Sequence, residues 1–294
     1  MAMRVFRPGV GRRCGPLMIR AIVLAIVALS PAYAATVEGA APVRIVCLGD
    51  SITQSDYAHY SYRYGLWKKL IDSGASFDLV GSMTHNWNNS TTPPSPQDPV
   101  WPTYGGLSFD QDHDGHWGYR VDQILDGRND REPYPGYGKL SDWLAGYTAD
   151  AALVHLGTND AFQGVATSTT IAKLGQVIDA LRNDNPSIII LLAKVIPHTG
   201  DITSINNLNG QIPVLVASKN TSQSPIYVVD QFTGFNASTD TFDGVHPNAT
   251  GEGKMAQKWF DALRDDVFVP EPATLALIGL GAGVAVLHRR RSRG

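Results

Sequence analysis

Side chains suited to acyl transfer occur in short segments at both ends of the central part of the chain. Ser51 follows an apolar run in Gly-Asp-Ser-Ile-Thr, whereas Asp243 and His246 lie three residues apart near the other end. A serine hydroxyl becomes a strong nucleophile when a histidine takes its proton, an acid orients that histidine, and hydrogen-bond donors receive the oxyanion. Because Asp243 and His246 are so close, one turn can present both, with Pro247 at the first position of the next helix.

Ser51, His246 and Asn159, which lies in the later segment Leu-Gly-Thr-Asn-Asp, also have ordinary structural interpretations. Ser51 has the residue type of a helix N-cap, Asn159 that of a turn residue, and His246 that of a surface residue before a helix. A catalytic site is absent only if all three structural interpretations are correct at once, so the combination of residues favours catalysis. The Asp50 carboxylate is expected to fix its turn by accepting backbone amides rather than to perform chemistry.

The elements that position these residues alternate between strands and helices. Apolar runs of strand length cover residues 43–48, 77–80, 152–156, 188–195 and 226–229, and helical spacing covers residues 62–73, 169–183, 204–218 and 248–264. Continuous apolar strands separated by helices predict a three-layer α/β/α sandwich with a five-stranded parallel sheet. Functional residues of such sheets gather at the carboxyl ends of the strands. Residues 85–118 are expected to form a long loop over that edge.

The order and spacing of four segments resemble a known family. GDSIT, the later glycine in GHWGYR, LGTND and DGVHPNATG resemble the four blocks of the flavodoxin-like SGNH, or GDSL, hydrolases across residues 45–263. The resemblance implies Ser51 as nucleophile, His246 as base and Asp243 as its acid. It also implies an oxyanion hole from the amides of Ser51 and Gly118 and the Asn159 side chain, with no metal or cofactor. The chain lacks the Gly-x-Ser-x-Gly elbow of the α/β-hydrolases.

The substrate class is indicated by residues 109–124. This stretch is similar to the second block of acetyl xylan esterase-like members, except that Trp117 replaces a small residue and leaves acetyl specificity open. The candidate substrate-binding residues are Asp50, His116, Trp117, Tyr119 and His198. Aromatic residues of the loop either face sugar rings or pack the loop onto the sheet. The leading hypothesis is an esterase that removes acetyl or short acyl groups from carbohydrate. The alternatives are a lipase, lysophospholipase or thioesterase of the superfamily, or a non-catalytic polysaccharide-binding surface protein.

One acidic segment has part of a calcium-binding pattern. Asp110, Asp112, Asp114 and Gly115 match the first half of an EF-hand loop, but Val121 stands where the bidentate glutamate belongs. The segment is therefore not expected to be an EF-hand, and a different calcium site stays open.

Both ends of the chain carry targeting patterns. Residues 1–34 combine a basic leader, an apolar run and Ala32-Tyr33-Ala34, which predicts a signal peptide cut by signal peptidase. Residues 270–294 combine Pro-Glu-Pro, a short apolar run and an arginine cluster, and resemble the PEP-CTERM sorting signal. That resemblance implies export to the periplasm, cell surface or exterior, transient anchoring in the membrane and removal of the tail by an exosortase-type enzyme. A simple tail anchor or a docked helix is the alternative.

The net charge narrows the class of partner, and the cysteine content excludes an intrachain disulfide. The two end segments carry nine of the 24 basic residues and one of the 27 acidic residues, so residues 35–269 have a formal charge of about −11. Such a surface repels nucleic acid and suits a neutral substrate. Cys14 lies in the leader and Cys47 in the first strand, so the mature chain has no intrachain disulfide.

Overall fold

The computed structural model describes residues 41–87, 101–128 and 138–268. The chain separates into two units, Met1–Ala40 and Ala41–Gly294, and every described residue belongs to the second. The predicted signal peptide and the sorting segment lie outside the described residues, and the domain limits at 35 and 269 stay predictions. None of the described helices is both long and apolar enough to span a bilayer.

A parallel sheet in the order β2-β1-β4-β5-β6 forms the centre of the fold. Its strands are β1 Val43–Gly49, β2 Phe77–Val80, β4 Ala151–His155, β5 Ile189–Lys194 and β6 Ile226–Asp230. The predicted five-stranded sheet is confirmed, with a sixth strand added: β3 (Asp114–Gly115) pairs with β1 next to Leu48 and Gly49. After β1 the chain forms β2 on one side of β1, and it later returns to form β4 on the other side of β1. The switch point between β1 and β4 is where such sheets bind ligands.

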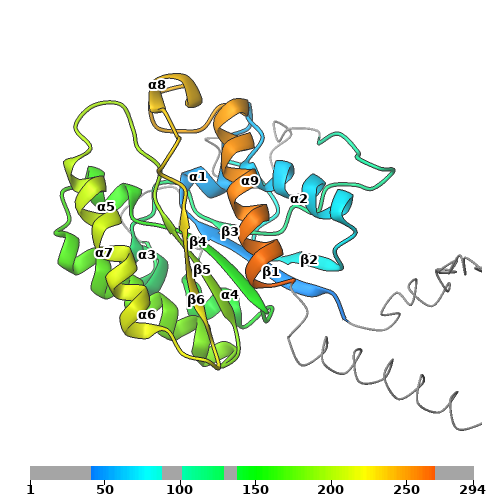
Figure 1. Cartoon of the computed structure of the whole chain (residues 1–294), viewed down its shortest axis with the longest axis horizontal. Coiled ribbons are helices and arrows are strands. Elements are labelled where there is room, and N and C mark those ends of the chain that lie inside the picture. Colours follow the sequence, from blue (N-terminus) through cyan, green and yellow to red (C-terminus); the bar gives the residue numbers. More distant parts are fainter. Residues whose placement is uncertain (1–40, 88–100, 129–137, 269–294) are drawn as a thin grey trace, which may run out of the picture. The chain divides into compact units, whose positions relative to one another are not determined.

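Helices cover both faces of the sheet, as Figure 1 shows. α2 and α9 pack with Ile45, Cys47 and Leu153 on one face. α3, α4, α6 and α7 pack with Val46, Val154 and Ile190 on the other. The helices are α1 Ser51–Gln54, α2 Tyr62–Ser73, α3 Val121–Asp126, α4 Leu140–Leu144, α5 Thr158–Phe162, α6 Thr167–Asp184, α7 Thr203–Lys219, α8 Ala237–Asp240 and α9 Ala249–Asp266. This arrangement confirms the predicted three-layer sandwich.

The long loop predicted over residues 85–118 is more ordered than the sequence suggests in its described parts. It contains β3, and its His113 forms an antiparallel bridge with Met83, just before the loop. Trp101 and Phe109 pack against the core cluster on the α2 side, with ring centroids 4.6 Å apart. Aromatic burial therefore fixes this part of the loop to the domain, as one of the two interpretations of its aromatic residues predicted.

Candidate active site

Ser51 is the first residue of α1, directly after the end of β1. Asp50 caps this short helix: its Oδ1 accepts the amide of Ile52 at 3.0 Å. Asp50 is fully buried, and this burial raises its pKa to about 7. Ser51 itself is 6% exposed. The strand end and the capped turn thus hold the serine at the carboxyl edge of the sheet.

Ser51, His246 and Asp243 form a continuous chain of hydrogen-bonding groups. The Ser51 Oγ lies 2.9 Å from His246 Nε2, and His246 Nδ1 lies 2.7 Å from Asp243 Oδ2. With the imidazole proton on Nδ1, that nitrogen donates to the carboxylate and Nε2 accepts from the serine hydroxyl. This is the arrangement in which a histidine can remove a serine proton.

A tight loop before α9 presents Asp243 and His246. The amide of Phe242 donates to the His246 carbonyl at 3.0 Å, and Thr241 bridges Pro247. Asp243 Oδ1 accepts the amides of Val245 and His246 at 2.9 and 2.7 Å. Partial burial alone would raise the Asp243 pKa, but hydrogen bonds from the His246 ring and from these amides outweigh it and lower the pKa below its ordinary value. The carboxylate therefore stays ionised.

Residues 115–119 connect β1, which leads to Ser51, with α5, which carries Asn159. The His116 amide donates to the Gly49 carbonyl at 3.0 Å, and β3 ends at Gly115, where an added Cβ would lie 2.5 Å from the amide nitrogen of Gln54. At the other end the Asn159 Nδ2 donates to the Tyr119 carbonyl at 2.9 Å. Gly118 has φ +76°, a conformation that favours glycine. Hydrogen bonds thus link the segment that contains Gly118 to the end of β1 and to the Asn159 side chain.

Trp117 lies directly against the imidazole of His246. Their ring centroids are 4.5 Å apart with planes at 18°, and Trp87 stacks with Trp117 at 5.7 Å and 14°. Phe242 is 40% exposed and lies 5.8 Å from His246 at 19°. His246 is therefore part of a row of nearly parallel rings.

The other candidate substrate-binding residues are distributed differently. His116 is 1% exposed and stacks on Trp143 at 3.9 Å, and Tyr119 is 4% exposed in the core cluster, with its ring centroid 5.2 Å from that of His116. His198 is half-buried beside Phe162 at 4.3 Å, in a loop that the Thr199 amide joins to the Gly244 carbonyl at 2.7 Å. Trp117 and His198 are thus the more accessible members of the predicted set, whereas His116, Tyr119 and Asp50 are buried.

Two residues that support the site were not singled out from the sequence. Arg63 is 1% exposed, and its guanidinium donates to the carbonyls of Thr53 and Gln111 at 2.9 Å each. Burial lowers the pKa of Arg63. Gln54 Oε1 accepts the amide of Trp117 at 2.8 Å. Both residues fix α1 to the long loop, and the position of Gln54, three residues after Ser51, is the only signal the sequence offers for it.

The acidic segment uses most of its carboxylate oxygens within the protein. Asp110 Oδ2 accepts the amide of Leu79 at 2.8 Å, and Asp114 accepts from Ser82 and Tyr147. Burial, followed by repulsion from Asp110, raises the pKa of Asp112 to about 6. In the part of the chain that the structure describes, no group of three or more His, Cys, Asp or Glu side chains is arranged to hold a metal ion.

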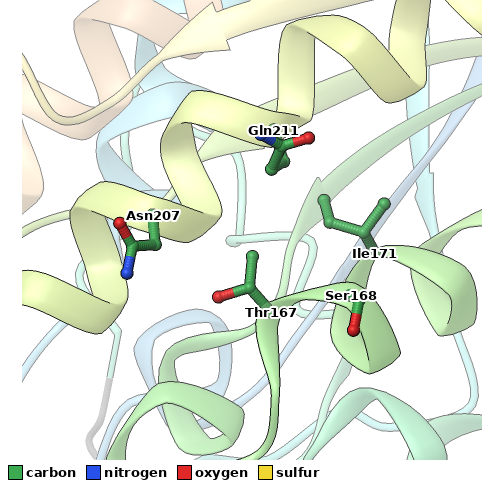
Figure 2. A pocket seen from close by; sticks show the side chains of 5 residues that line it. All are labelled: Thr167, Ser168, Ile171, Asn207 and Gln211. Atoms are coloured by element: carbon green, nitrogen blue, oxygen red, sulfur yellow. The ribbon is translucent and has the colours of Figure 1, made fainter.

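A separate hollow lies between the start of α6 and the middle of α7. It has a volume of about 500 Å³ and uncharged lining residues, and Figure 2 shows Thr167, Ser168 and Ile171 across from Asn207 and Gln211. None of the candidate catalytic residues lines it. It is therefore a surface feature distinct from the site at Ser51.

Comparison with known proteins decides the family. Residues 47–254 match the GDSL-like lipase/acylhydrolase family. The chain belongs to this family. Residues 268–292 match the PEP-CTERM protein-sorting motif, which is linked to export and to anchoring at the C-terminus. The predicted GDSL family, the esterase class and the sorting motif are thus confirmed.

Individual relatives of this GDSL-like chain are esterases. It is 29% identical over 261 residues to a multidomain esterase of Ruminococcus flavefaciens, a match that covers 83% of this chain and 31% of the relative. It is similar to a family 3 carbohydrate esterase from Talaromyces cellulolyticus, at 28% identity and a TM-score of 0.61, covering 76% of this chain and 97% of that one. An acetyl esterase crystallised as a serine-to-alanine mutant with acetate matches at 27% identity, with the same TM-score and coverage.

Proposed function

We propose that this GDSL-like protein is an exported serine esterase that removes acetyl or other short acyl groups from carbohydrate. The observation that carries the proposal is the unbroken contact from Asp243 through His246 to Ser51, at 2.7 and 2.9 Å. Two similar solved structures, one of a carbohydrate esterase and one of an acetyl esterase, support the substrate class. The acidic surface, with a formal charge of about −11 over residues 35–269, suits an uncharged sugar ester.

The proposed reaction proceeds in two halves. Ser51 Oγ attacks the ester carbonyl carbon while its proton moves to His246 Nε2, and the carbonyl oxygen becomes an oxyanion. The amides of Ser51 and Gly118 and the Asn159 side chain donate hydrogen bonds to that oxyanion. His246 then protonates the leaving sugar hydroxyl, and an acyl-serine remains. Water, deprotonated by His246, releases the acid and restores Ser51.

Asp243 serves this cycle without changing its own protonation. Its Oδ2 fixes the imidazole with the proton on Nδ1 and stabilises the imidazolium formed after proton transfer. The lowered pKa of Asp243 keeps the carboxylate charged throughout. The acid, the base and the nucleophile thus have separate roles set by their hydrogen bonds.

The proposed location follows from the two end segments. The sorting motif at residues 268–292 suggests transport out of the cytoplasm and temporary retention at a membrane. Removal of this segment by an exosortase-type enzyme, after signal peptidase has cut the leader, would release the domain at the cell surface or beyond. Such a place would give an esterase access to polysaccharide.

The experiment that tests the substrate class is a comparison of esters on the purified full chain. Acetylated xylan and peracetylated xylose are compared by kcat/KM with 4-nitrophenyl palmitate, a long-chain ester. The proposal predicts clear preference for the acetylated sugars. Preference for palmitate would assign the protein to the lipases of its family, and turnover of none of these esters would favour a binding protein.

A further inference from the structure

The faces of the His246 ring have a different environment from its nitrogens. Both nitrogens point in the ring plane, toward Ser51 and Asp243. Trp117 lies almost parallel to the ring, 4.5 Å away at 18°. The indole therefore contacts a surface of the imidazole that proton transfer leaves unused.

The helix that carries the nucleophile also anchors this indole. The Trp117 amide donates to Oε1 of Gln54, the last residue of α1, at 2.8 Å, and Gln54 is 2% exposed. Trp87 stacks with Trp117, and the Trp87 amide donates to the Ser55 carbonyl at 2.8 Å. Residues 51–55 thus contain Ser51 and also supply the hydrogen-bond acceptors for the amides of both tryptophans. A rotation of the imidazole would have to displace a ring fixed in this way.

Phe242 continues the row on the loop that carries His246, but it makes a weaker contact. Its centroid is 5.8 Å from His246, whereas it stacks closely on His59 at 3.7 Å and 2°. Of these two rings, Trp117 has the shorter centroid distance to His246. The effect on the base is therefore assigned to Trp117.

We propose that Trp117 is a positioning residue that holds His246 toward Ser51 and stabilises the imidazolium formed during acylation. This inference rests on the proposed function. The face of an indole attracts a cation more strongly than a neutral ring. The contact is therefore stronger after Ser51 has transferred its proton than before, and such differential binding lowers the barrier. Loss of the indole should reduce kcat and leave the binding of a small ester unchanged.

The test compares Trp117→Phe and Trp117→Leu in the full chain, with kcat and KM measured for 4-nitrophenyl acetate and 4-nitrophenyl butyrate. Leucine keeps apolar bulk but has no π face, so its kcat is expected to fall about tenfold, equivalent to about 1.4 kcal/mol. The fall should be the same for both esters, with KM unchanged. Phenylalanine keeps a π face and should retain kcat within about threefold.

Trp101→Ala is the matched control, because Trp101 is a tryptophan of the same long loop whose ring contacts Tyr60, Tyr64 and Phe109. Its kcat should equal that of the wild type even if its melting temperature falls. Melting curves establish that each variant is folded at the assay temperature. If the leucine variant unfolds, Trp117→Met replaces it with the same expected loss.

Three results would overturn the inference. An unchanged kcat in folded Trp117→Leu would show that the indole does not act on the base. A change confined to KM, or one that differs between acetate and butyrate, would make Trp117 a wall of the acyl pocket. A wild-type chain that hydrolyses no ester and resists a fluorophosphonate at Ser51 would remove the proposed function and this inference with it, whereas an active wild type isolates the failure to Trp117.

Discussion

Asp243 uses its two carboxylate oxygens for different partners, and replacement by asparagine separates them. Oδ1 accepts the amides of Val245 and His246 at 2.9 and 2.7 Å, and Oδ2 accepts from His246 Nδ1 at 2.7 Å. The side chain of asparagine has a single acceptor oxygen, so it satisfies only one of these two sets. Because two amide donors converge on Oδ1, the oxygen of Asp243→Asn is expected to stay there. Its NH2 group then faces the imidazole.

This reversal places the imidazole proton on the wrong nitrogen. An NH2 donor facing Nδ1 requires that Nδ1 accept, so the proton moves to Nε2, which faces Ser51 at 2.9 Å. A protonated Nε2 cannot take the serine proton. A wrong tautomer of this kind lowers kcat about 10⁴-fold, or about 5 kcal/mol of barrier. Both backbone hydrogen bonds of the loop remain, so the melting temperature and KM should change little.

The assay is steady-state hydrolysis of 4-nitrophenyl acetate by the wild type and Asp243→Asn. Asp201→Asn is the control: the Oδ1 of this exposed carboxylate accepts the Thr203 amide at 2.9 Å just before α7, and asparagine keeps an acceptor oxygen for it. It should retain the wild-type kcat. If Asp243→Asn keeps more than about a tenth of the wild-type kcat, the tautomer reasoning is wrong.

Two further predictions concern Asn159 and Glu252. Asn159→Ala should lower kcat about 10²- to 10³-fold with a nearly unchanged melting temperature, because among the described residues its side chain hydrogen-bonds to the Tyr119 carbonyl alone. An unchanged kcat would remove Asn159 from the oxyanion hole. Burial, partly offset by Arg63, raises the pKa of Glu252 from 4.5 to about 9. A carboxyl group whose pKa is higher in the folded than in the unfolded state lowers the free energy of unfolding as the pH rises from 4.5 to about 9. For Glu252 this loss of stability is roughly 3 kcal/mol by pH 7. Glu252→Gln should therefore be more stable at pH 7 to 9, and an equal pH slope of the unfolding free energy in both proteins would contradict this.

The regular elements could be predicted from apolar periodicity. α2 has the predicted limits, Tyr62–Ser73, and each strand of the main sheet begins and ends within about a residue of its apolar run. The elements that escaped prediction are short: α1, α3, α4, α5 and α8 have four to six residues each, and β3 has two. Periodicity needs several turns or alternations to be visible, so the length of these elements explains the difference.

The candidate site could be predicted in its chemistry but not in its support. Ser51, Asp243 and His246 lie in short motifs whose residue types carry the information. The burial of Arg63 depends on carbonyl groups of residues 53 and 111, which only the fold brings together. The stacking of Trp117 on His246 likewise depends on the path of a long loop. Contacts between distant segments have no local signal in the sequence.

We propose that Ser51 is an activated nucleophile, and its reaction with a fluorophosphonate is the decisive assay. The full chain and Ser51→Ala are treated at neutral pH, and the modified peptide is identified by mass spectrometry. We expect one phosphonylated residue in the wild type, at Ser51, and none in the variant. Equal labelling of both proteins, or an unmodified Ser51 in the wild type, would contradict it.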